Sequence, residues 1–265
     1  MAEAKKAPNP YKTHWYNRRF AYWFNKHATR QEGIHARPPV IHLAPLAGVK
    51  PDGKPAVRIF LGTEPAQRRA ERVFIFAVEK MRNPARAYEI HLMTDIAGLD
   101  RSAWKTGFTN YRYCIPEWAG GEGRAIYNDV DQIYLADPAE MFDMDLGGKG
   151  IAAVTAEENS VMLIDCAKMK PLWTMADIKA GKSHGHFKSI VTANKLLAPL
   201  PGPWNARDGE YPVNESKCIH YTTLHTQPWE PFPDQLRYGE SPVASAWHDL
   251  EREADRTGYQ QPDAD

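Results

Sequence analysis

The tripeptide Asp129-Val130-Asp131 places two carboxylates one residue apart near the middle of a 265-residue chain. Apolar segments at 124–128 and 132–135 flank it, and both are expected to be buried strands. Side chains i and i+2 of an extended chain point to the same side, so both carboxylates can face one open space where the first strand ends. They repel each other there unless a positive charge compensates them. The pattern predicts a divalent-cation site, although an isolated Asp-x-Asp more commonly lies in a solvated loop.

His220 is a third candidate ligand, because it lies near the end of a late apolar segment, 218–221. Two aspartates and one histidine can complete a Mn²⁺ or Mg²⁺ site together with diphosphate oxygens. The alternative is a packed, hydrogen-bonded histidine, which is the commoner state of such a residue. His184 and His186 lie in a Gly-flanked segment, 181–186, for which we expect an exposed loop.

A strand–helix–strand unit earlier in the chain predicts where ligands can bind. Segment 57–62 has the pattern of a strand, 65–82 repeats apolar residues at helical spacing, and 88–95 alternates like a second strand. A βαβ unit of this length predicts parallel pairing with a right-handed crossover. Ligands of such sheets bind beyond the carboxyl ends of the strands. Together with the two aspartates, the cleft candidates are Gly62, Thr63, Glu64, Thr94 and Asp95.

The remaining segments predict shorter elements. Segment 103–114 is aromatic and carries Arg112, so we expect a helix there, with Arg112 either salt-bridged or directed at an anionic ligand. Residues 35–55 contain five prolines and predict an irregular connection. Short strands are expected at 150–155, 161–165 and 194–200, helices at 168–180 and 244–256, and a polar, mobile end after the last helix.

The composition excludes several classes of partner. Lys and Arg together number 33, as do Asp and Glu, so no nucleic acid or acidic partner is expected. Cys114, Cys166 and Cys218 lie far apart in apolar segments, which predicts buried free thiols in a reducing compartment, the cytoplasm. The first ten residues lack the apolar core of a signal peptide, and no stretch has the roughly 18 uninterrupted apolar residues of a membrane span.

Residues 11–27 interleave seven aromatic side chains with lysines and arginines. On a helix many of these side chains share one broad face, a pattern that suits a membrane interface, a partner groove or base stacking. Peripheral association with the cytoplasmic face of a membrane is one interpretation. The other, which is the commoner outcome, is a terminal helix that packs its rings onto the domain.

Several familiar site motifs do not occur in the sequence. It contains no GxGxxG, GxxxxGK[ST], HExxH or GxSxG pattern. Rossmann-type dehydrogenases, P-loop kinases and serine hydrolases are therefore disfavoured. The residues that remain as candidates for a functional site are Asp129, Asp131 and His220.

Five segments, in order, resemble the retaining glycosyltransferases of family 8, a GT-A group that includes glycogenin and bacterial lipopolysaccharide galactosyltransferases. They are IFLGTEPAQ (59–67), FTNYRYCIPEW (108–118), RAIYNDVDQIYLADPAEMFDMDL (124–146), SVMLIDC (160–166) and CIHYTTLHTQPW (218–229). The resemblance implies an α/β fold of the GT-A type, with three α/β/α layers around a mostly parallel sheet. We expect a catalytic domain at 56–232, an N-terminal extension at 1–55, and a C-terminal helix and tail at 233–265.

The resemblance also implies roles for individual residues. The metal ligands would be Asp129, Asp131 and His220. The donor nucleotide sugar would be contacted by Gly62, Thr63, Glu64, Arg112 and Asp129. The implied reaction is Mn²⁺- or Mg²⁺-dependent transfer of a sugar from a nucleotide sugar, in particular a UDP-sugar, to a glycan, lipid or protein hydroxyl, with retention of anomeric configuration.

The C-terminal segment departs from the family pattern. The family usually has a Lys before Pro-Trp that binds phosphate, but Gln227 stands there, and we hypothesise that His225 supplies the missing positive charge at the donor site. The family's Asp-Gln-Asp segment has no clear counterpart at 181–194. A catalytically degenerate homologue that binds nucleotide or acts as a scaffold is therefore the alternative, against which the intact aspartate pair argues. A sugar nucleotidyltransferase would need a Gly-rich loop with Arg and Lys that the sequence lacks.

Overall fold

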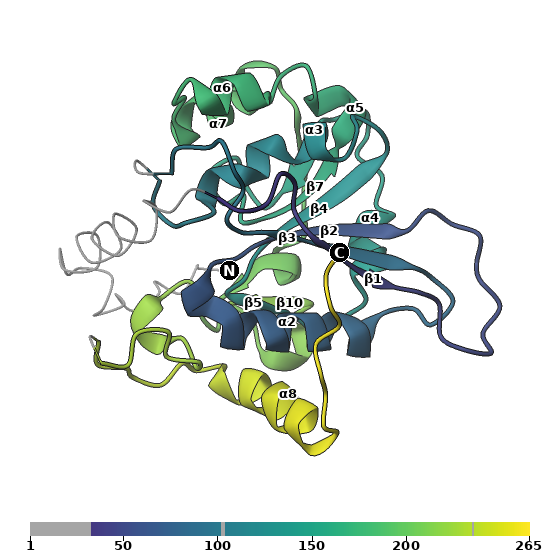
Figure 1. Ribbon diagram of the computed structural model, residues 1–265, viewed down its shortest axis with the longest axis vertical. Coiled ribbons are helices and arrows are strands. Elements are labelled where there is room, and N and C mark those ends of the chain that lie inside the picture. Colours follow the sequence, from purple (N-terminus) through teal and green to yellow (C-terminus); the bar gives the residue numbers. More distant parts are fainter. Residues whose placement is uncertain (1–32, 102–103, 235) are drawn as a thin grey trace, which may run out of the picture.

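The computed structural model describes residues 33–101, 104–234 and 236–265. In this part of the chain, seven strands form a central sheet in the order β1-β3-β2-β4-β7-β6-β8 (Figure 1). The strands are β1 (Val40–Leu43), β2 (Val57–Gly62), β3 (Tyr88–Met93), β4 (Arg124–Asp129), β6 (Ile151–Ala153), β7 (Val161–Asp165) and β8 (Leu197–Pro199). Only β1 and β7 run against the other strands of this sheet. The predicted α/β class with a mostly parallel sheet is confirmed.

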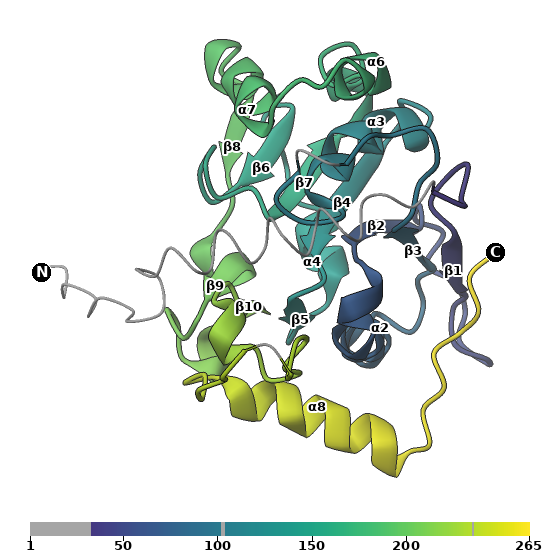
Figure 2. The same cartoon turned by 60° about the vertical axis from the view of Figure 1, so that its left-hand side comes forward.

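Helices cover both faces of the sheet and complete three layers (Figures 1 and 2). One face carries α2 (Arg68–Met81), and α8 (Ala244–Arg256) packs outside α2. The other face carries α3 (Ile115–Trp118), α5 (Cys166–Met169), α6 (Met175–Lys179) and α7 (His184–Ala193). α2 forms where it was predicted, because its apolar residues recur at three–four spacing and are buried as one stripe. It connects β2 to β3, which pair in parallel, so the predicted βαβ unit is confirmed.

A second, three-stranded sheet lies beside the first and joins distant parts of the sequence. It contains β5 (Gln132–Tyr134), β9 (Ala206–Arg207) and β10 (Cys218–His220), with β10 in the centre. β10 pairs antiparallel with β5, and His220 lies opposite Gln132. This register brings a residue from late in the chain next to the turn that holds the two aspartates.

Several elements differ from the sequence expectations. The segment 35–55 is not wholly irregular, since it contains β1, whose buried Ile41 and Leu43 alternate with exposed His42. The segment 168–180 is two short helices rather than one, because Pro171 separates α5 from α6, which Thr174 caps.

Two further expectations are corrected. The expected loop at 181–186 ends early, because Ser183 caps the start of α7 and accepts a hydrogen bond from the His186 backbone N–H. The helix expected at 103–114 is a 3₁₀ segment, η2 (Thr109–Cys114), that leads into α3. Other short helices are α4 (Pro138–Phe142), η1 (Pro65–Gln67), η3 (Gly202–Asn205), η4 (Val213–Glu215) and η5 (Leu224–Thr226).

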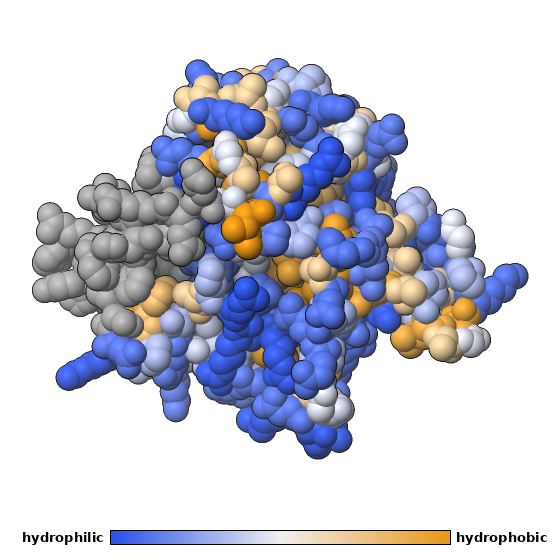
Figure 3. All heavy atoms as spheres, viewed as in Figure 1, coloured by the Kyte–Doolittle hydropathy of each residue, from blue (hydrophilic) through white to orange (hydrophobic). Residues whose placement is uncertain are grey.

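The C-terminal segment after α8 is not a free tail. Residues 257–265 run back along α2 to the edge of the main sheet, where Val40 and Asp265 exchange two backbone hydrogen bonds of 2.9 and 3.0 Å (Figures 1 and 2). The prediction that the chain has a mobile end after α8 is therefore wrong. The face in Figure 3 is mostly hydrophilic over α8, whereas apolar residues gather on the loop at 44–56, where Leu46 and Val49 are exposed.

The prediction of buried free thiols is confirmed, since Cys114, Cys166 and Cys218 are buried and unpaired. The aromatic and basic segment at 11–27 lies outside the described residues, so its role stays a prediction. Among the residues that the structure describes, the helices are too short or too polar to cross a membrane.

Candidate functional site

The Asp-x-Asp turn lies at the carboxyl end of β4, in the middle of the main sheet. Asp129 is paired with Gly62 of β2, and the Val130 backbone N–H donates to the Gly62 carbonyl oxygen at 3.0 Å. A buried amide pair shapes the turn, because the Asn128 side-chain N–H donates to Gln132 Oε1 at 2.7 Å. The Tyr134 hydroxyl donates to Asn128 Oδ1 at 2.8 Å. These bonds between buried groups fix where the two carboxylates point.

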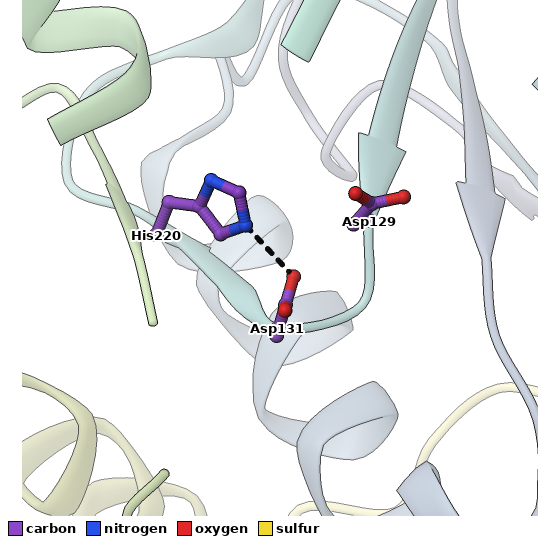
Figure 4. Close-up of side chains that lie close together, drawn as sticks. All are labelled: Asp129, Asp131 and His220. Atoms are coloured by element: carbon purple, nitrogen blue, oxygen red, sulfur yellow. Dashed lines mark ion pairs between the residues drawn. The ribbon is translucent and has the colours of Figure 1, made fainter. Parts of the chain in front are cut away.

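Three potential metal ligands meet at this turn. Asp129, Asp131 and His220 each offer one ligand atom, and these atoms all lie within 4.8 Å of one another. Figure 4 shows His220 on β10 facing Asp131, with Asp129 at the end of β4 to one side of this pair. His220 Nε2 lies 3.2 Å from Asp131 Oδ1. The structure thus brings together the three residues that the sequence suggested.

The surroundings of these side chains fit a divalent cation. His220 Nδ1 lies 2.8 Å from Asn205 Oδ1, an acceptor, so Nδ1 carries the proton and Nε2 is left facing Asp131. While His220 Nε2 is unprotonated, the buried Asp131 Oδ1, 3.2 Å away from it, has no hydrogen-bond donor in the described structure. A buried carboxylate oxygen in that state is costly, and a bound cation would compensate it.

The charges of the group without a cation support the same conclusion. Burial lowers the pKa of His220, but the carboxylates of Asp131 and Asp129 raise it by more, so its pKa is raised. Burial raises the pKa of Asp129, the Arg112 guanidinium lowers it, and the Asp131 carboxylate raises it again, with an upward net shift. The raised pKa of His220 reflects the negative charge of the two carboxylates beside it, whereas that of Asp129 is due first to burial.

Arg112 is the main counter-charge of Asp129. Its Nη2 lies 3.0 Å from Asp129 Oδ1, and its Nη1 donates to the backbone and side-chain oxygens of Asn159 at 2.9 and 3.0 Å. Its Nε donates to the Thr109 carbonyl oxygen at 2.8 Å, and the guanidinium stacks 4.3 Å above the Tyr127 ring. The sequence left open whether Arg112 forms a salt bridge or is directed at an anionic ligand, and the structure shows the salt bridge with Asp129. The contact with a donor stays a prediction.

The turn after β2 adjoins the aspartates. Gly62 has no room for a side chain, since a Cβ there would lie 2.5 Å from Phe108 Cδ2. The Thr63 hydroxyl donates to Glu71 Oε2 at 2.8 Å, and Glu64 Oε2 accepts from the Gly107 backbone N–H at 2.9 Å. Burial raises the pKa of Glu64 despite that hydrogen bond. Their contacts with a nucleotide stay predictions.

Gln227, in the C-terminal segment 218–229, lies next to Asp131. Its Nε2 donates to the Tyr221 carbonyl oxygen at 3.0 Å and lies 3.4 Å from Asp131 Oδ2. Its Oε1 is buried and has no donor within the described structure. His225 lies in η5, with Nδ1 3.0 Å from the Arg237 carbonyl oxygen, and its proposed phosphate contact stays a prediction.

Sequence reasoning missed the residues that support the ligands. Tyr127 could have been identified from the sequence, because Tyr127 and Asp129 lie two positions apart on one strand and therefore point to the same side. In the structure the Tyr127 hydroxyl donates to Asp129 Oδ1. Asn205 gave no signal, since nothing in its proline-rich segment marks it as a partner of His220. His184 was expected in an exposed loop, but it is half-buried and its Nδ1 lies 2.6 Å from the Tyr113 hydroxyl oxygen.

No protein-family model and no curated protein sequence matches the chain. Similar solved structures include the glycosyltransferase GlyE of Streptococcus pneumoniae TIGR4, with a TM-score of 0.51 and 15% identity over 79% of this chain. The bifunctional glycosyltransferase WbbM gives a TM-score of 0.54 and 14% identity over 76% of this chain. The galactosyltransferase LgtC gives a TM-score of 0.52 and 12% identity, and the match covers 77% of this chain and 100% of the LgtC chain.

The matched region spans 65% of GlyE and 53% of WbbM. Likeness at this level of identity shows the fold and no more. The architecture and these neighbours agree, and the chain has the GT-A fold found in glycosyltransferases.

Proposed function

We propose that the chain is a metal-dependent glycosyltransferase of family 8 that transfers a hexose from a UDP-sugar to a hydroxyl acceptor, with retention of anomeric configuration. The observation that carries this proposal is the group Asp129, Asp131 and His220 at the carboxyl end of β4 in a GT-A fold. That edge of the sheet is where α/β folds bind ligands. The five sequence segments that resemble family 8 support the family assignment.

Asp129, Asp131 and His220 would hold Mn²⁺ or Mg²⁺. When bound, the cation neutralises the charge that develops on the departing nucleoside diphosphate. Arg112 orients Asp129, and Asn205 keeps the Nε2 lone pair of His220 directed at the site. These contacts preorganise the ligands, so little reorganisation is needed when the donor binds.

The groups around the metal ligands would hold the rest of the donor. Gly62, Thr63 and Glu64 lie at the same edge of the sheet and would contact the nucleotide. Gln227 would offer an amide where the family has an ammonium, and His225 would add positive charge near the diphosphate. The acceptor would be a hydroxyl of a glycan, a lipid or a protein.

One observation favours a second candidate, a degenerate homologue that binds nucleotide without turnover. All three nitrogens of the Arg112 guanidinium donate to acceptors of the protein itself, namely Thr109, Asn159 and Asp129. Together with Gln227, this arrangement leaves less positive charge for the diphosphate than the family pattern provides. Measured turnover distinguishes the two candidates.

The first experiment measures nucleotide release. Purified protein with Mn²⁺ is incubated with several UDP- and GDP-sugars, and free UDP or GDP is followed over time. Release from a UDP-sugar that stops on chelation of the metal is expected. Mn²⁺-dependent binding of UDP without release from any donor would favour the degenerate homologue, and absence of both would rule out the proposal.

The second experiment tests the site itself. Asp131→Ala should abolish Mn²⁺-dependent binding of UDP while the far-UV circular dichroism stays that of the wild type. Asp249→Ala is the matched control, because Asp249 is an exposed aspartate on α8, paired only with Arg252 in the described contacts. Equal UDP affinity of Asp131→Ala and wild type would show that the site assignment is wrong.

A further inference from the structure

The loop at 44–56 holds apolar side chains in the solvent. Leu46 is 49% exposed and Val49 is 38% exposed, and apolar residues gather on this loop in Figure 3. Lys50 and Lys54 follow along the same loop and are exposed as well. Lysines attract anionic lipid headgroups and exposed apolar side chains can enter a bilayer, so the loop has the composition of a membrane-contact segment.

The tip of this loop stands on a fixed base. The Leu46 backbone N–H donates to the Pro84 carbonyl oxygen at 2.8 Å. The Asp52 backbone N–H donates to the Ala85 carbonyl oxygen at 2.9 Å. Both acceptors belong to the turn between α2 and β3, so the tip between Leu46 and Asp52 projects from a supported position. Asp52 is the acidic residue of the loop, and its Oδ1 accepts from the Lys54 backbone N–H at 2.9 Å.

An open cavity of about 660 Å³ lies at the base of the loop, at the amino ends of β2 and β4. Its volume is in the range of small-molecule sites, so it can admit a lipid headgroup. Four cations line it, namely Lys54, Arg58, Arg86 and Arg124. Three carboxylates line it as well, namely Glu89, Glu122 and Asp143. The charge that an incoming anion meets therefore depends on which of these groups already have partners.

Two of the three carboxylates are engaged by basic side chains. Asp143 Oδ2 lies 2.9 Å from Lys54 Nζ and 2.7 Å from Arg86 Nη1, so two cations share one carboxylate. Glu89 Oε2 lies 3.4 Å from His91 Nε2, and this contact lowers the pKa of Glu89. Lys54 and Arg86 thus bring one positive charge more than Asp143 balances.

Arg58 and Arg124 form no ion pair with a carboxylate among the described residues. Arg58 donates to three backbone carbonyl oxygens, including that of Arg124 at 2.9 Å. Arg124 Nη1 donates to two carbonyl oxygens at and just after the end of α4, at 3.0 and 2.8 Å. These bonds hold the guanidinium groups without neutralising them, and they leave Arg124 Nε and Nη2 available to an anion. The exposed Glu122 carboxylate is the lining group that opposes an anion.

We propose that the loop at 44–56 and the cavity at its base form a docking surface for an anionic phospholipid membrane. Leu46 and Val49 enter the bilayer, and a headgroup phosphate binds to Arg58 and Arg124. Guanidinium groups pair with phosphate oxygens through charge-assisted hydrogen bonds. The six residues of β4 separate this cavity from the metal ligands by roughly 17 Å. The docking surface and the metal site therefore lie at opposite ends of one strand and can be occupied together.

The first test is sedimentation of the full-length protein with vesicles. The wild type should bind vesicles of equimolar phosphatidylcholine and phosphatidic acid, and not vesicles of phosphatidylcholine alone. Leu46→Asp should weaken binding about tenfold, because an apolar contact is lost and a negative charge faces the anionic surface. Val213→Asp is the matched control, since Val213 is 37% exposed in η4 and lies outside the cavity.

A second variant tests the cavity. Glu122→Gln should strengthen binding to the anionic vesicles about fivefold, because it removes the carboxylate that opposes the headgroup phosphate. Glu122 is exposed, so the change does not disturb the core. Glu215→Gln, at an exposed glutamate in η4, is the matched control and should bind as the wild type does. Equal binding of both variants would show that the cavity does not bind a headgroup.

A fluorescent label locates the contact. The three native cysteines are buried, so an environment-sensitive thiol label such as NBD reacts selectively with the variant Val49→Cys. Its emission should shift to shorter wavelength when the anionic vesicles are added, because the label leaves water for the bilayer. The same label on Val213→Cys should show no shift.

Absence of binding to the anionic vesicles, or equal binding of Leu46→Asp and wild type, would overturn the inference. Binding without a shift of the label at position 49 would overturn it too, because the contact would then lie elsewhere, for example in residues 11–27. Binding of inorganic phosphate without binding of vesicles would overturn it in favour of a soluble phosphate compound. None of these measurements uses UDP or Mn²⁺, so the inference and the proposed function can fail independently.

Discussion

Asn205 Oδ1 lies 2.8 Å from His220 Nδ1, and both side chains are buried beside the two aspartates. The amide oxygen accepts the Nδ1 proton, so the imidazole presents Nε2 to Asp131, 3.2 Å away. Asn205 belongs to η3 and His220 to β10, so this hydrogen bond depends on how two segments 15 residues apart pack. Outer partners of this kind fix ligand orientation in metal sites.

Asn205→Ala should weaken Mn²⁺ binding by roughly 10- to 100-fold, because His220 loses the group that fixes its tautomer and orientation. Titration with Mn²⁺ followed by calorimetry measures the change. Asn214→Ala, at an exposed asparagine in η4, is the control and should bind Mn²⁺ as the wild type does. Unchanged affinity in Asn205→Ala would show that Asn205 does not orient a metal ligand.

Arg112→Lys should lower the free energy of unfolding by about 2 kcal/mol, because one ammonium cannot satisfy the acceptors of Thr109, Asn159 and Asp129 together. Urea denaturation measures the loss. Adding Mn²⁺ should restore more stability to the variant than to the wild type, because the cation compensates Asp129. An equal Mn²⁺ effect on both proteins would contradict the role of Arg112 as the counter-charge of Asp129.

Gly62→Ala should destabilise the fold by about 1–3 kcal/mol through overpacking. The added methyl group would lie 2.5 Å from Phe108 Cδ2 and 3.0 Å from the Tyr127 hydroxyl oxygen. Gly185→Ala in α7 is the matched control, because its nearest neighbour, Ser183 Oγ, is at an ordinary 3.7 Å. Thermal unfolding of both variants checks the prediction, which equal melting temperatures would refute.

Asp143→Asn should show a pH-dependent loss of stability. A hydrogen bond from Arg86 lowers the pKa of Asp143, so this carboxylate stabilises the folded state above its unfolded pKa and loses that effect as the pH falls through the lower, folded value. Because Asp143 is 39% exposed, the loss near pH 7 should be only about 1 kcal/mol. Unfolding experiments at neutral pH and near pH 3 should show the two proteins converging, and a constant difference would contradict this account.

The sequence predicted the parts of the structure that are encoded locally. The stripe on α2 and the alternation in β3 repeat within a few residues, so their periods are visible without knowledge of the fold. The Asp-x-Asp turn was predictable for the same reason, since apolar strands flank it directly. Even Tyr127 could be placed beside Asp129 from the two-residue period of a strand.

The missed features depend on contacts between distant segments. β1 lies among prolines, and only its pairing with β3 makes it a strand. The pairing of β10 with β5, which positions His220, joins segments about 85 residues apart and has no local sign. The hydrogen bond of Asn205 with His220 is set by packing in the same way, and a single polar residue in a loop does not reveal its partner.

The contact between Asp265 and Val40 also bears on how the protein behaves at high concentration. β1 is an edge strand, and an uncovered edge offers unpaired backbone groups to another molecule. The C-terminal segment occupies part of that edge, and the adjoining loop at 44–56 carries the exposed apolar residues Leu46 and Val49. Removing residues 261–265 would therefore expose a template for aggregation, which light scattering would detect.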